Sequence, residues 1–282
     1  MPITELPRSV NKNLSQNIAH SKMMGFSLEQ VFFKITLAVI PCLIFALIVY
    51  IRDKHRPEPL WLIVLSFGLG IVAFLLNLLL SWYPHSIFQG GGDTIIQKAI
   101  HVFAVIALPE ELCKFIMVRG LLFRNRDSFT EPIDGIVYAV MVGMGFAAIE
   151  NVVYVMKYGA GYGILRMFSA IPAHAMLGVF MGFYLGIAKF TRRKKKRFTV
   201  LGLFIPIAFH GFYNFFLFVH FIPGMWIGAG ICLLLAFFFS ARAISIHQRF
   251  SPYNPDNPRF AHLHRKPIRF LGDGSGGQVS SI

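Results

Sequence analysis

Long apolar segments alternate with short polar connections along most of the chain, and this pattern predicts membrane-spanning helices. Each apolar segment is long enough to cross about 30 Å of hydrocarbon at roughly 1.5 Å per residue. The segments, in chain order, cover residues 31–51, 60–82, 95–123, 132–156, 164–190, 198–219 and 225–246. We therefore expect an all-α membrane protein, a polytopic bundle of about seven transmembrane helices.

The two ends of the chain lack this pattern. Residues 1–30 are polar and show no periodicity, so we expect an N-terminal tail. Residues 31–246 form one membrane domain in this interpretation. Residues 247–282 are rich in proline, asparagine, glycine and serine, which is typical of a disordered segment.

Basic residues indicate the orientation of the bundle. Most lysines and arginines lie in the connections 51–59, 119–131 and 189–198 and after residue 242, whereas 83–94 and 220–224 carry none. The positive-inside rule then places the C-terminus in the cytoplasm and the N-terminus outside. Seven helices leave the basic residues of the N-terminal tail on the outer side, so a count of eight helices stays open as an alternative.

Composition supports a membrane location and argues against nucleic-acid binding. The chain is 55% hydrophobic and only 14% charged, against about 25% charged residues in soluble domains. The net charge of +14 could suggest a nucleic-acid partner, but the basic residues lie in short connections and tails. We expect the lipid bilayer as partner and no nucleic acid. The three cysteines lie in apolar segments and form no CxxC motif, so neither a disulfide framework nor a cysteine metal site is predicted.

Three charged residues interrupt the third apolar segment. Glu110, Glu111 and Lys114 follow Pro109, and their spacing places all three on one helix face. A charged side chain near the bilayer centre costs roughly 2.5–3.5 kcal/mol on insertion scales, so such residues need a partner or a cavity. A structural ion pair is one explanation. Lys114 neutralises only one glutamate, however, and the other needs a proton, a metal or another partner.

Other polar residues in the apolar segments fall at a similar depth. Glu150 and Asn151 lie in the fourth segment, His174 in the fifth, and His210 and Asn214 in the sixth. With the predicted topology, four consecutive helices bring these groups to the middle and outer half of the bilayer. Each residue also has a structural alternative: a histidine can bond a helix carbonyl, and an asparagine can join two helices. Their convergence in one layer favours a functional site.

Peptide hydrolysis suits this set of side chains. A buried glutamate can act as general base on water, while histidine and asparagine polarise the carbonyl and stabilise the oxyanion. Glutamate and histidine are also zinc ligands, so the cofactor is either absent or a divalent metal such as zinc. The candidate metal ligands are Glu110, Glu111, Glu150, His174 and His210. The chain has neither an HExxH motif nor a GxSxG nucleophile elbow.

Several ordered motifs resemble the PrsW-type intramembrane proteases, which are related to CAAX prenyl proteases and bacteriocin-processing enzymes. Asp53 and residues 57–59 (PEP) resemble the first loop of that family. The resemblance covers residues 40–245. The matching stretches are 110–114 (EELCK), 134–138 (DGIVY), 145–151 (GFAAIEN), 172–178 (PAHAMLG), 181–186 (MGFYLG) and 210–214 (HGFYN).

The resemblance implies an intramembrane endopeptidase of the bacterial cytoplasmic membrane. Its substrate would be a membrane-anchored protein, such as an anti-sigma factor, cleaved near the extracytoplasmic side. The resemblance does not decide between a metal and a glutamate mechanism. The residues it implies are Glu110, Glu111, His174 and His210 as catalytic and Glu150 and Asn214 as supporting. We add Lys114 and Asn151 to the supporting residues, because they accompany Glu111 and Glu150 in the same apolar segments.

Two other functions use the same residue types. A proton- or cation-coupled transporter also buries acids and histidines near mid-membrane, and a non-catalytic membrane binding protein can contain them. The chain has no internal repeat, and its polar residues gather on four consecutive segments. Both features favour the protease.

Overall fold

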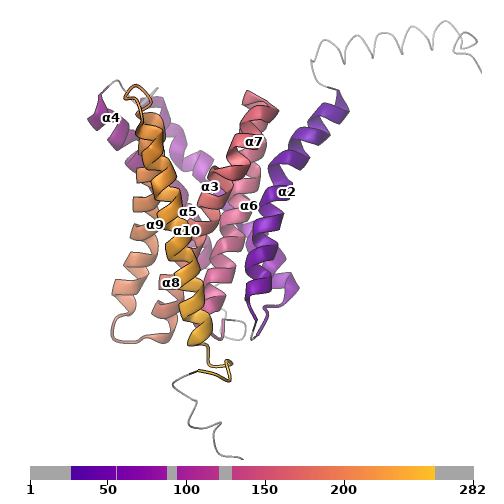
Figure 1. Ribbon diagram of the computed structural model, residues 1–282, viewed down its shortest axis with the longest axis vertical. Coiled ribbons are helices and arrows are strands. Elements are labelled where there is room, and N and C mark those ends of the chain that lie inside the picture. Colours follow the sequence, from indigo (N-terminus) through magenta and orange to yellow (C-terminus); the bar gives the residue numbers. More distant parts are fainter. Residues whose placement is uncertain (1–26, 55, 88–93, 121–128, 258–282) are drawn as a thin grey trace, which may run out of the picture.

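The computed structural model describes residues 27–54, 56–87, 94–120 and 129–257, and every regular element in these ranges is a helix (Figure 1). The predicted tails at residues 1–26 and 258–282 lie outside the described residues. The helices are α2 (Leu28–Arg52), α3 (Leu60–Ile87), α4 (Ile95–Ile100), the π-helix η3 (His101–Ala107), α5 (Leu108–Gly120), α6 (Pro132–Tyr158), α7 (Ala160–Phe168), α8 (Ala170–Phe190), α9 (Lys195–Phe218) and α10 (Met225–Arg249).

Among the described residues, six helical segments are long and apolar enough to cross a membrane. They are α2, α3, α6, the pair α7 and α8 taken together, α9 and α10. The remaining predicted segment, 95–123, is helical from Ile95 to Gly120 but is divided into α4, η3 and α5. The expected all-α polytopic membrane architecture is confirmed.

Helix α6 forms the centre of the bundle. Its most apolar stretch is 78% buried, compared with 22% for each of α2, α9 and α10. Side chains on all faces of α6, including Tyr138, Met141 and Phe146, are enclosed by neighbouring helices. The outer helices instead expose leucine, isoleucine and phenylalanine side chains, which is expected of a surface solvated by lipid.

Small residues let α8 approach α6 closely, and the four-residue spacing of Gly178, Gly182 and Gly186 places all three on one face of α8. A Cβ atom at Gly178 would lie 2.9 Å from the Cα of Val140. A Cβ atom at Gly143 on α6 would lie 3.1 Å from the backbone oxygen of His174. Glycine at these positions therefore allows the backbones of α6 and α8 to come close together, which brings His174 near α6.

The π-helix η3 immediately precedes the charged residues of α5. The backbone N–H of Leu108 donates to the carbonyl of Phe103, five residues earlier. Pro109 has no N–H to continue regular α-helical bonding, so the wider turn ends where the proline begins. This irregular turn sets the rotation at which Glu110 and Glu111 leave the helix.

The predicted fifth segment, 164–190, is broken at Ser169 into α7 and α8. Ser169 has φ −126° and ψ −73°, outside helical geometry. Pro172 has no N–H for the carbonyl of Phe168 and its ring would clash with that carbonyl in a continuous helix. Because of this break, α7 does not continue the axis of α8, and its side chains reach α6 in a different orientation.

Three of the four stretches predicted to be basic lie at one end of the bundle, and most of the fourth, 119–131, is outside the described residues. Figure 1 shows the α2–α3 connection, the α8–α9 connection and the end of α10 at the same end, with the α9–α10 connection at the opposite end. The side chain of Gln248 donates to the carbonyl of Arg52, and Arg56 Nη1 lies 2.5 Å from Tyr253 Oη. These contacts attach the turns that follow α10 to the α2–α3 connection.

Candidate active site

Acids and bases from four helices meet inside the bundle. We call this group the mixed cluster; each of its residues is at most 8% exposed. Its members are Glu110, Glu111 and Lys114 on α5, Glu150 on α6, His174 on α8 and His210 on α9. The convergence predicted from topology alone is thus present in the structure.

Glu111 is fully buried, and one of its oxygens accepts two contacts. Lys114 Nζ lies 2.8 Å from Glu111 Oε1, and His210 Nδ1 lies 2.9 Å from the same oxygen. A lysine ammonium is a donor only, so Glu111 Oε1 is the acceptor of this hydrogen bond. Glu111 therefore joins the base of its own helix to the imidazole of α9.

Lys114 lies at the centre of the mixed cluster. Besides Glu111, its Nζ contacts His174 Nδ1 at 3.0 Å and lies 3.8 Å from Glu110 Oε2. The ammonium also lies 4.2 Å from the centre of the Phe146 ring, a cation–π distance. Four groups thus share one positive charge, which leaves the cluster with more carboxylates than this single lysine can neutralise.

The imidazoles of His174 and His210 differ in their hydrogen-bond partners. His174 Nδ1 faces the Lys114 ammonium and must accept, so its Nε2 carries the proton that is donated to Glu150 Oε2 at 2.9 Å. His210 Nδ1 faces a carboxylate and must donate, which leaves Nε2 uncommitted. His210 Nε2 lies 3.9 Å from Glu110 Oε2. Of the two histidines, His210 is the one with a nitrogen available for chemistry.

Glu110 is the carboxylate with the fewest close partners in the cluster. Its Oε2 atom is buried and accepts no hydrogen bond from a described residue. Its nearest ionic neighbours, Lys114 and His210, are 3.8 Å and 3.9 Å away. This is the surplus acid that the sequence indicated.

Arg166 of α7 completes the support of Glu150, and the sequence analysis did not include it among the site residues. Its Nη2 lies 2.6 Å from Glu150 Oε2, its Nε lies 2.5 Å from Asn151 Oδ1, and its guanidinium stacks 4.0 Å from the centre of the Tyr154 ring. The signal was available: Arg166 is the only lysine or arginine between residues 157 and 189, inside an apolar segment.

Two predicted supporting residues differ in their surroundings. Asn151 is fully buried and accepts from Arg166, so it holds the arginine rather than facing Glu110. Asn214 is half-buried, one turn after His210 on α9, and makes no hydrogen bond to another described residue. Its amide is therefore available to a bound molecule.

The donor set fits a divalent metal by residue type and spacing. Donor atoms of Glu110, Glu111 and His174 lie within 4.8 Å of one another, and both glutamates have a buried Oε2 without a hydrogen-bond partner in the described chain. Two carboxylates and an imidazole are ligands that Zn²⁺ accepts. Lys114 already contacts Glu111 and His174, so the ammonium and a metal would compete for the same ligands.

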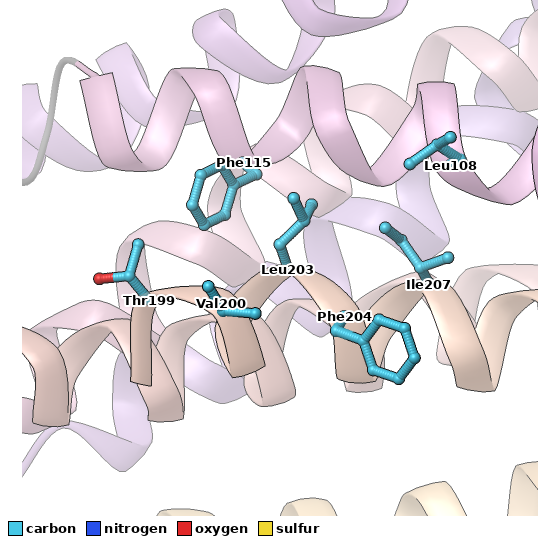
Figure 2. Close-up of a pocket in the computed structure, with 7 residues that line it drawn as sticks. All are labelled: Leu108, Phe115, Thr199, Val200, Leu203, Phe204 and Ile207. Atoms are coloured by element: carbon cyan, nitrogen blue, oxygen red, sulfur yellow. The ribbon is translucent and has the colours of Figure 1, made fainter. Parts of the chain in front are cut away.

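An apolar groove lies beside the mixed cluster. Figure 2 shows side chains of α5 and α9 around a cavity of about 410 Å³. Leu108 lies two residues before Glu110, and Ile207 lies three residues before His210. Val200, Phe204 and Leu108 are well exposed on the membrane-facing surface. The residues that line the groove are Leu108, Phe115, Thr199, Val200, Leu203, Phe204 and Ile207.

Residues 58–243 match the profile described as PrsW family intramembrane metalloprotease. The chain belongs to this PrsW family. Three relatives, each named Protease PrsW, align with this chain over most of their own length. The relative from Oceanobacillus iheyensis is 36% identical over 64% of this chain and 80% of its own. The relative from Clostridioides difficile is 34% identical (66% and 79%), and that from Bacillus subtilis is 32% identical (60% and 75%).

Membership of the PrsW family confirms the resemblance found in the sequence and makes the chain an intramembrane protease. It also decides against the transporter and the non-catalytic binding protein. The family description includes a metal-dependent activity, which the donor set of the mixed cluster fits. No solved structure matches the chain.

Proposed function

We propose that the mixed cluster cleaves a peptide bond of a membrane-anchored protein, with Glu110 as the general base. The observation that carries this proposal is that no ionic partner of Glu110 in the described chain lies closer than 3.8 Å, whereas Glu111 has partners at 2.8 Å and 2.9 Å. A general base needs a free lone pair within reach of the water that it deprotonates. Glu111 is fully buried and its charge is engaged by Lys114 at 2.8 Å, which suits it to positioning instead.

His210 supplies the second catalytic group in this proposal. When Glu110 takes a proton from water, the water oxygen attacks the carbonyl carbon and negative charge develops on the carbonyl oxygen. With the ring proton on Nδ1, His210 Nε2 starts as an acceptor 3.9 Å from Glu110 Oε2, so it can take from Glu110 the proton removed from water. The imidazolium can then hydrogen bond that oxygen and deliver the proton to the leaving amine. The Asn214 amide, one turn further along α9, is free to stabilise the same oxygen.

His174 acts as a positioning residue in this proposal. Both of its nitrogens are committed, one to Lys114 and the other to Glu150. It therefore links the Arg166–Glu150 pair to the lysine that neutralises Glu111. If a divalent metal binds, Glu110, Glu111 and His174 would hold it, and the metal would supply a bound water that ionises near neutral pH.

The groove between α5 and α9 fits the apolar membrane segment of the substrate. Its lining is hydrophobic, and its edge reaches the turns that carry Glu110 and His210. A helix or extended segment lying there would bring its backbone next to the general base without crossing the bundle core. The basic connections lie at the opposite end from the α9–α10 connection (Figure 1), which supports a cytoplasmic C-terminus and cleavage towards the extracytoplasmic side of a bacterial cytoplasmic membrane.

The test is cleavage of a single-span reporter reconstituted with the full chain in liposomes. Wild type is compared with Glu110→Gln, Glu111→Gln and His210→Ala, with and without a strong chelator. Glu29→Gln is the matched control, because Glu29 is an exposed glutamate at the start of α2, outside the cluster. General-base catalysis contributes about 10²- to 10⁴-fold, so Glu110→Gln should lower the cleavage rate by that range.

The chelator separates the two mechanisms. Cleavage that survives chelation but is lost in Glu110→Gln supports the glutamate as base without a metal. Loss on chelation that Zn²⁺ reverses makes Glu110, Glu111 and His174 metal ligands. A Glu110→Gln variant that cleaves at the wild-type rate contradicts the assignment of Glu110.

A further inference from the structure

A second group of buried acids lies at the end of the bundle that holds the basic connections. Asp53 ends α2, Glu58 precedes α3, and Asp134 is in the first turn of α6. These three residues form what we call the acidic cluster. They are 2%, 4% and 0% exposed, and their donor atoms lie within 4.8 Å of one another.

The carboxylates of the acidic cluster are only partly satisfied by the described chain. Asp134 Oδ2 accepts from the backbone N–H of Thr130 at 2.6 Å and of Glu131 at 2.8 Å, and Glu58 accepts from the Tyr138 hydroxyl. Asp134 Oδ1 and both oxygens of Asp53 are buried without a hydrogen-bond partner among the described residues. Asp53 thus makes no close hydrogen bond, although the backbone N–H of Glu58 lies near enough to lower its pKa, and its carboxylate lies beside two others.

No base of the described chain lies within ion-pair distance of these three acids, in contrast to the mixed cluster, although the charge of Arg56 acts on Glu58 and lowers its pKa. Burial, followed by the neighbouring charges of Asp134 and Glu131, raises the pKa of Asp53 to about 7. Burial is also the largest cause that raises the pKa of Glu58. Buried carboxylates that face one another need a positive charge, or protons, to offset their desolvation and repulsion.

We propose that Asp53, Glu58 and Asp134 bind a hard divalent cation of the Mg²⁺, Ca²⁺ or Mn²⁺ class. All available donors are oxygens, and these cations prefer carboxylate oxygens, whereas the mixed cluster offers imidazole as well. The cation ties the α2–α3 connection to the first turn of α6. Tyr138, through its hydroxyl on Glu58, orients one of the ligands.

This cation site is separate from the active site. Asp134 and Glu150 lie on the same helix, sixteen residues apart, which corresponds to about 24 Å at 1.5 Å per residue. A cation here does not depend on whether the protease itself uses a metal, and it can be tested without measuring cleavage.

The experiment uses the full chain, purified in an uncharged detergent and stripped with a chelator that is then removed. Tb³⁺ serves as probe, because it is a hard stand-in for Ca²⁺ whose luminescence a nearby tyrosine, here Tyr138, can sensitise. Mg²⁺, Ca²⁺ and Mn²⁺ are then tested for displacement of Tb³⁺ and for their effect on the melting temperature. The variants are Asp53→Asn in the site, Glu111→Gln in the mixed cluster, and Asp256→Asn as a matched control at an exposed aspartate.

The proposal expects saturable Tb³⁺ luminescence that at least one of these divalent cations displaces, and a higher melting temperature with that cation. Asp53→Asn should lose both effects, and Glu111→Gln and Asp256→Asn should keep them. Tyr138→Phe should lose the sensitised luminescence and weaken binding of the divalent cation, seen as a thermal shift, by about tenfold.

Three results overturn the proposal. The first is a wild-type protein that neither binds Tb³⁺ saturably nor is stabilised by any of the divalent cations. The second is a luminescence signal that Glu111→Gln removes and Asp53→Asn retains, which places the cation in the mixed cluster. The third is a wild type indifferent to cations while Asp53→Asn is more stable, which means that protons, and not a metal, balance the acids. The wild-type titration decides even if Asp53→Asn fails to fold.

Discussion

Helix α6 carries buried acids near both of its ends, and the two groups differ in charge balance. At Glu150 the acids of the mixed cluster alternate with Lys114, Arg166 and two imidazoles. At Asp134 the acidic cluster has backbone N–H groups and a tyrosine hydroxyl but no ion pair to a described base. The same residue type on the same helix thus meets two electrostatic environments.

This difference in charge balance suits the mixed cluster to proton transfer and the acidic cluster to binding a cation. In the mixed cluster, Lys114 and Arg166 hold Glu111 and Glu150 at 2.8 Å and 2.6 Å, so the remaining acid, Glu110, can exchange a proton with water. In the acidic cluster no member is held in this way, and all three acids face one another. The experiments below change the charge balance of each cluster and ask whether its behaviour follows.

Removing the central base should have the largest effect. Lys114→Met keeps the length of the side chain but leaves Glu111 with an uncompensated buried charge. Breaking a buried pair from one side costs about 3–5 kcal/mol, so we expect the free energy of unfolding in detergent to fall by that amount. Cleavage of the reporter should also be lost, because His174 and Glu111 lose their shared partner.

The double variant Lys114→Met with Glu111→Gln is the control for this prediction. Removing both charges takes away the uncompensated carboxylate, so part of the lost stability should return. If the single and double variants are equally unstable, Lys114 acts through packing against Phe146 and not through its charge.

Changing Arg166 should have a smaller effect on the same cluster. Arg166→Gln loses the charge-assisted hydrogen bond to Glu150, worth about 1.5–3 kcal/mol of stability. We expect a lower kcat with little change in KM, because His174 is repositioned through Glu150 while the groove is untouched. Arg166→Lys should restore part of kcat, since an ammonium can reach Glu150 but cannot contact Asn151 at the same time. Equal kcat in all three proteins would contradict a positioning role.

Arg166 also distinguishes the part of the candidate site that can be predicted from the sequence from the part that cannot. Depth along each apolar segment was enough to bring Glu110, Glu111, Glu150, His174 and His210 together, because membrane helices run roughly antiparallel. Arg166 lies near the start of the predicted segment 164–190, and the break at Ser169 is not visible as a change in apolar pattern. The side chain therefore lies inside the bundle beside Glu150 instead of near the surface.

The acidic cluster was missed for a different reason. Asp134 lies in the first turn of the predicted helix 132–156, where an acid is typical of a helix cap, and it does accept the N–H groups of Thr130 and Glu131. Asp53 and Glu58 lie in a polar connection between two apolar segments. Charged residues in such connections are usually exposed to water, so the sequence gives no reason to expect that these two are buried. Their burial depends on how the α2–α3 connection packs against the start of α6, and periodicity contains no information about that packing.

Adding a divalent cation should reverse the order of stability of the wild type and Asp53→Asn. In chelator, Asp53→Asn should be as stable as the wild type or more stable, because it removes one of three facing acids. At a cation concentration ten times Kd, the wild type should gain about 1.4 kcal/mol and become the more stable protein. Thermal unfolding with and without Ca²⁺ or Mg²⁺ measures both orders, and the Asp256→Asn protein should follow the wild type throughout.

The smallest effect should come from the apolar groove, which borders the mixed cluster alone. Leu203→Trp on α9 fills part of the space between α5 and α9 with a bulkier side chain. We expect a several-fold rise in KM for the membrane-anchored reporter with kcat unchanged, because the substrate segment docks less well before any chemistry. Leu217→Trp on the same helix is the control, since Leu217 is partly exposed but does not line the groove.

The groove variant also separates the two clusters functionally. Neither α5 nor α9 contributes a residue to the acidic cluster, so Leu203→Trp should keep the wild-type response of the melting temperature to Ca²⁺ or Mg²⁺. A fall in kcat instead of a rise in KM would mean that the tryptophan moves α9 and thereby displaces His210 from Glu110. A matching loss of the cation response would mean that the bundle transmits the disturbance along α6, and the two acid groups would then have to be treated as one coupled system.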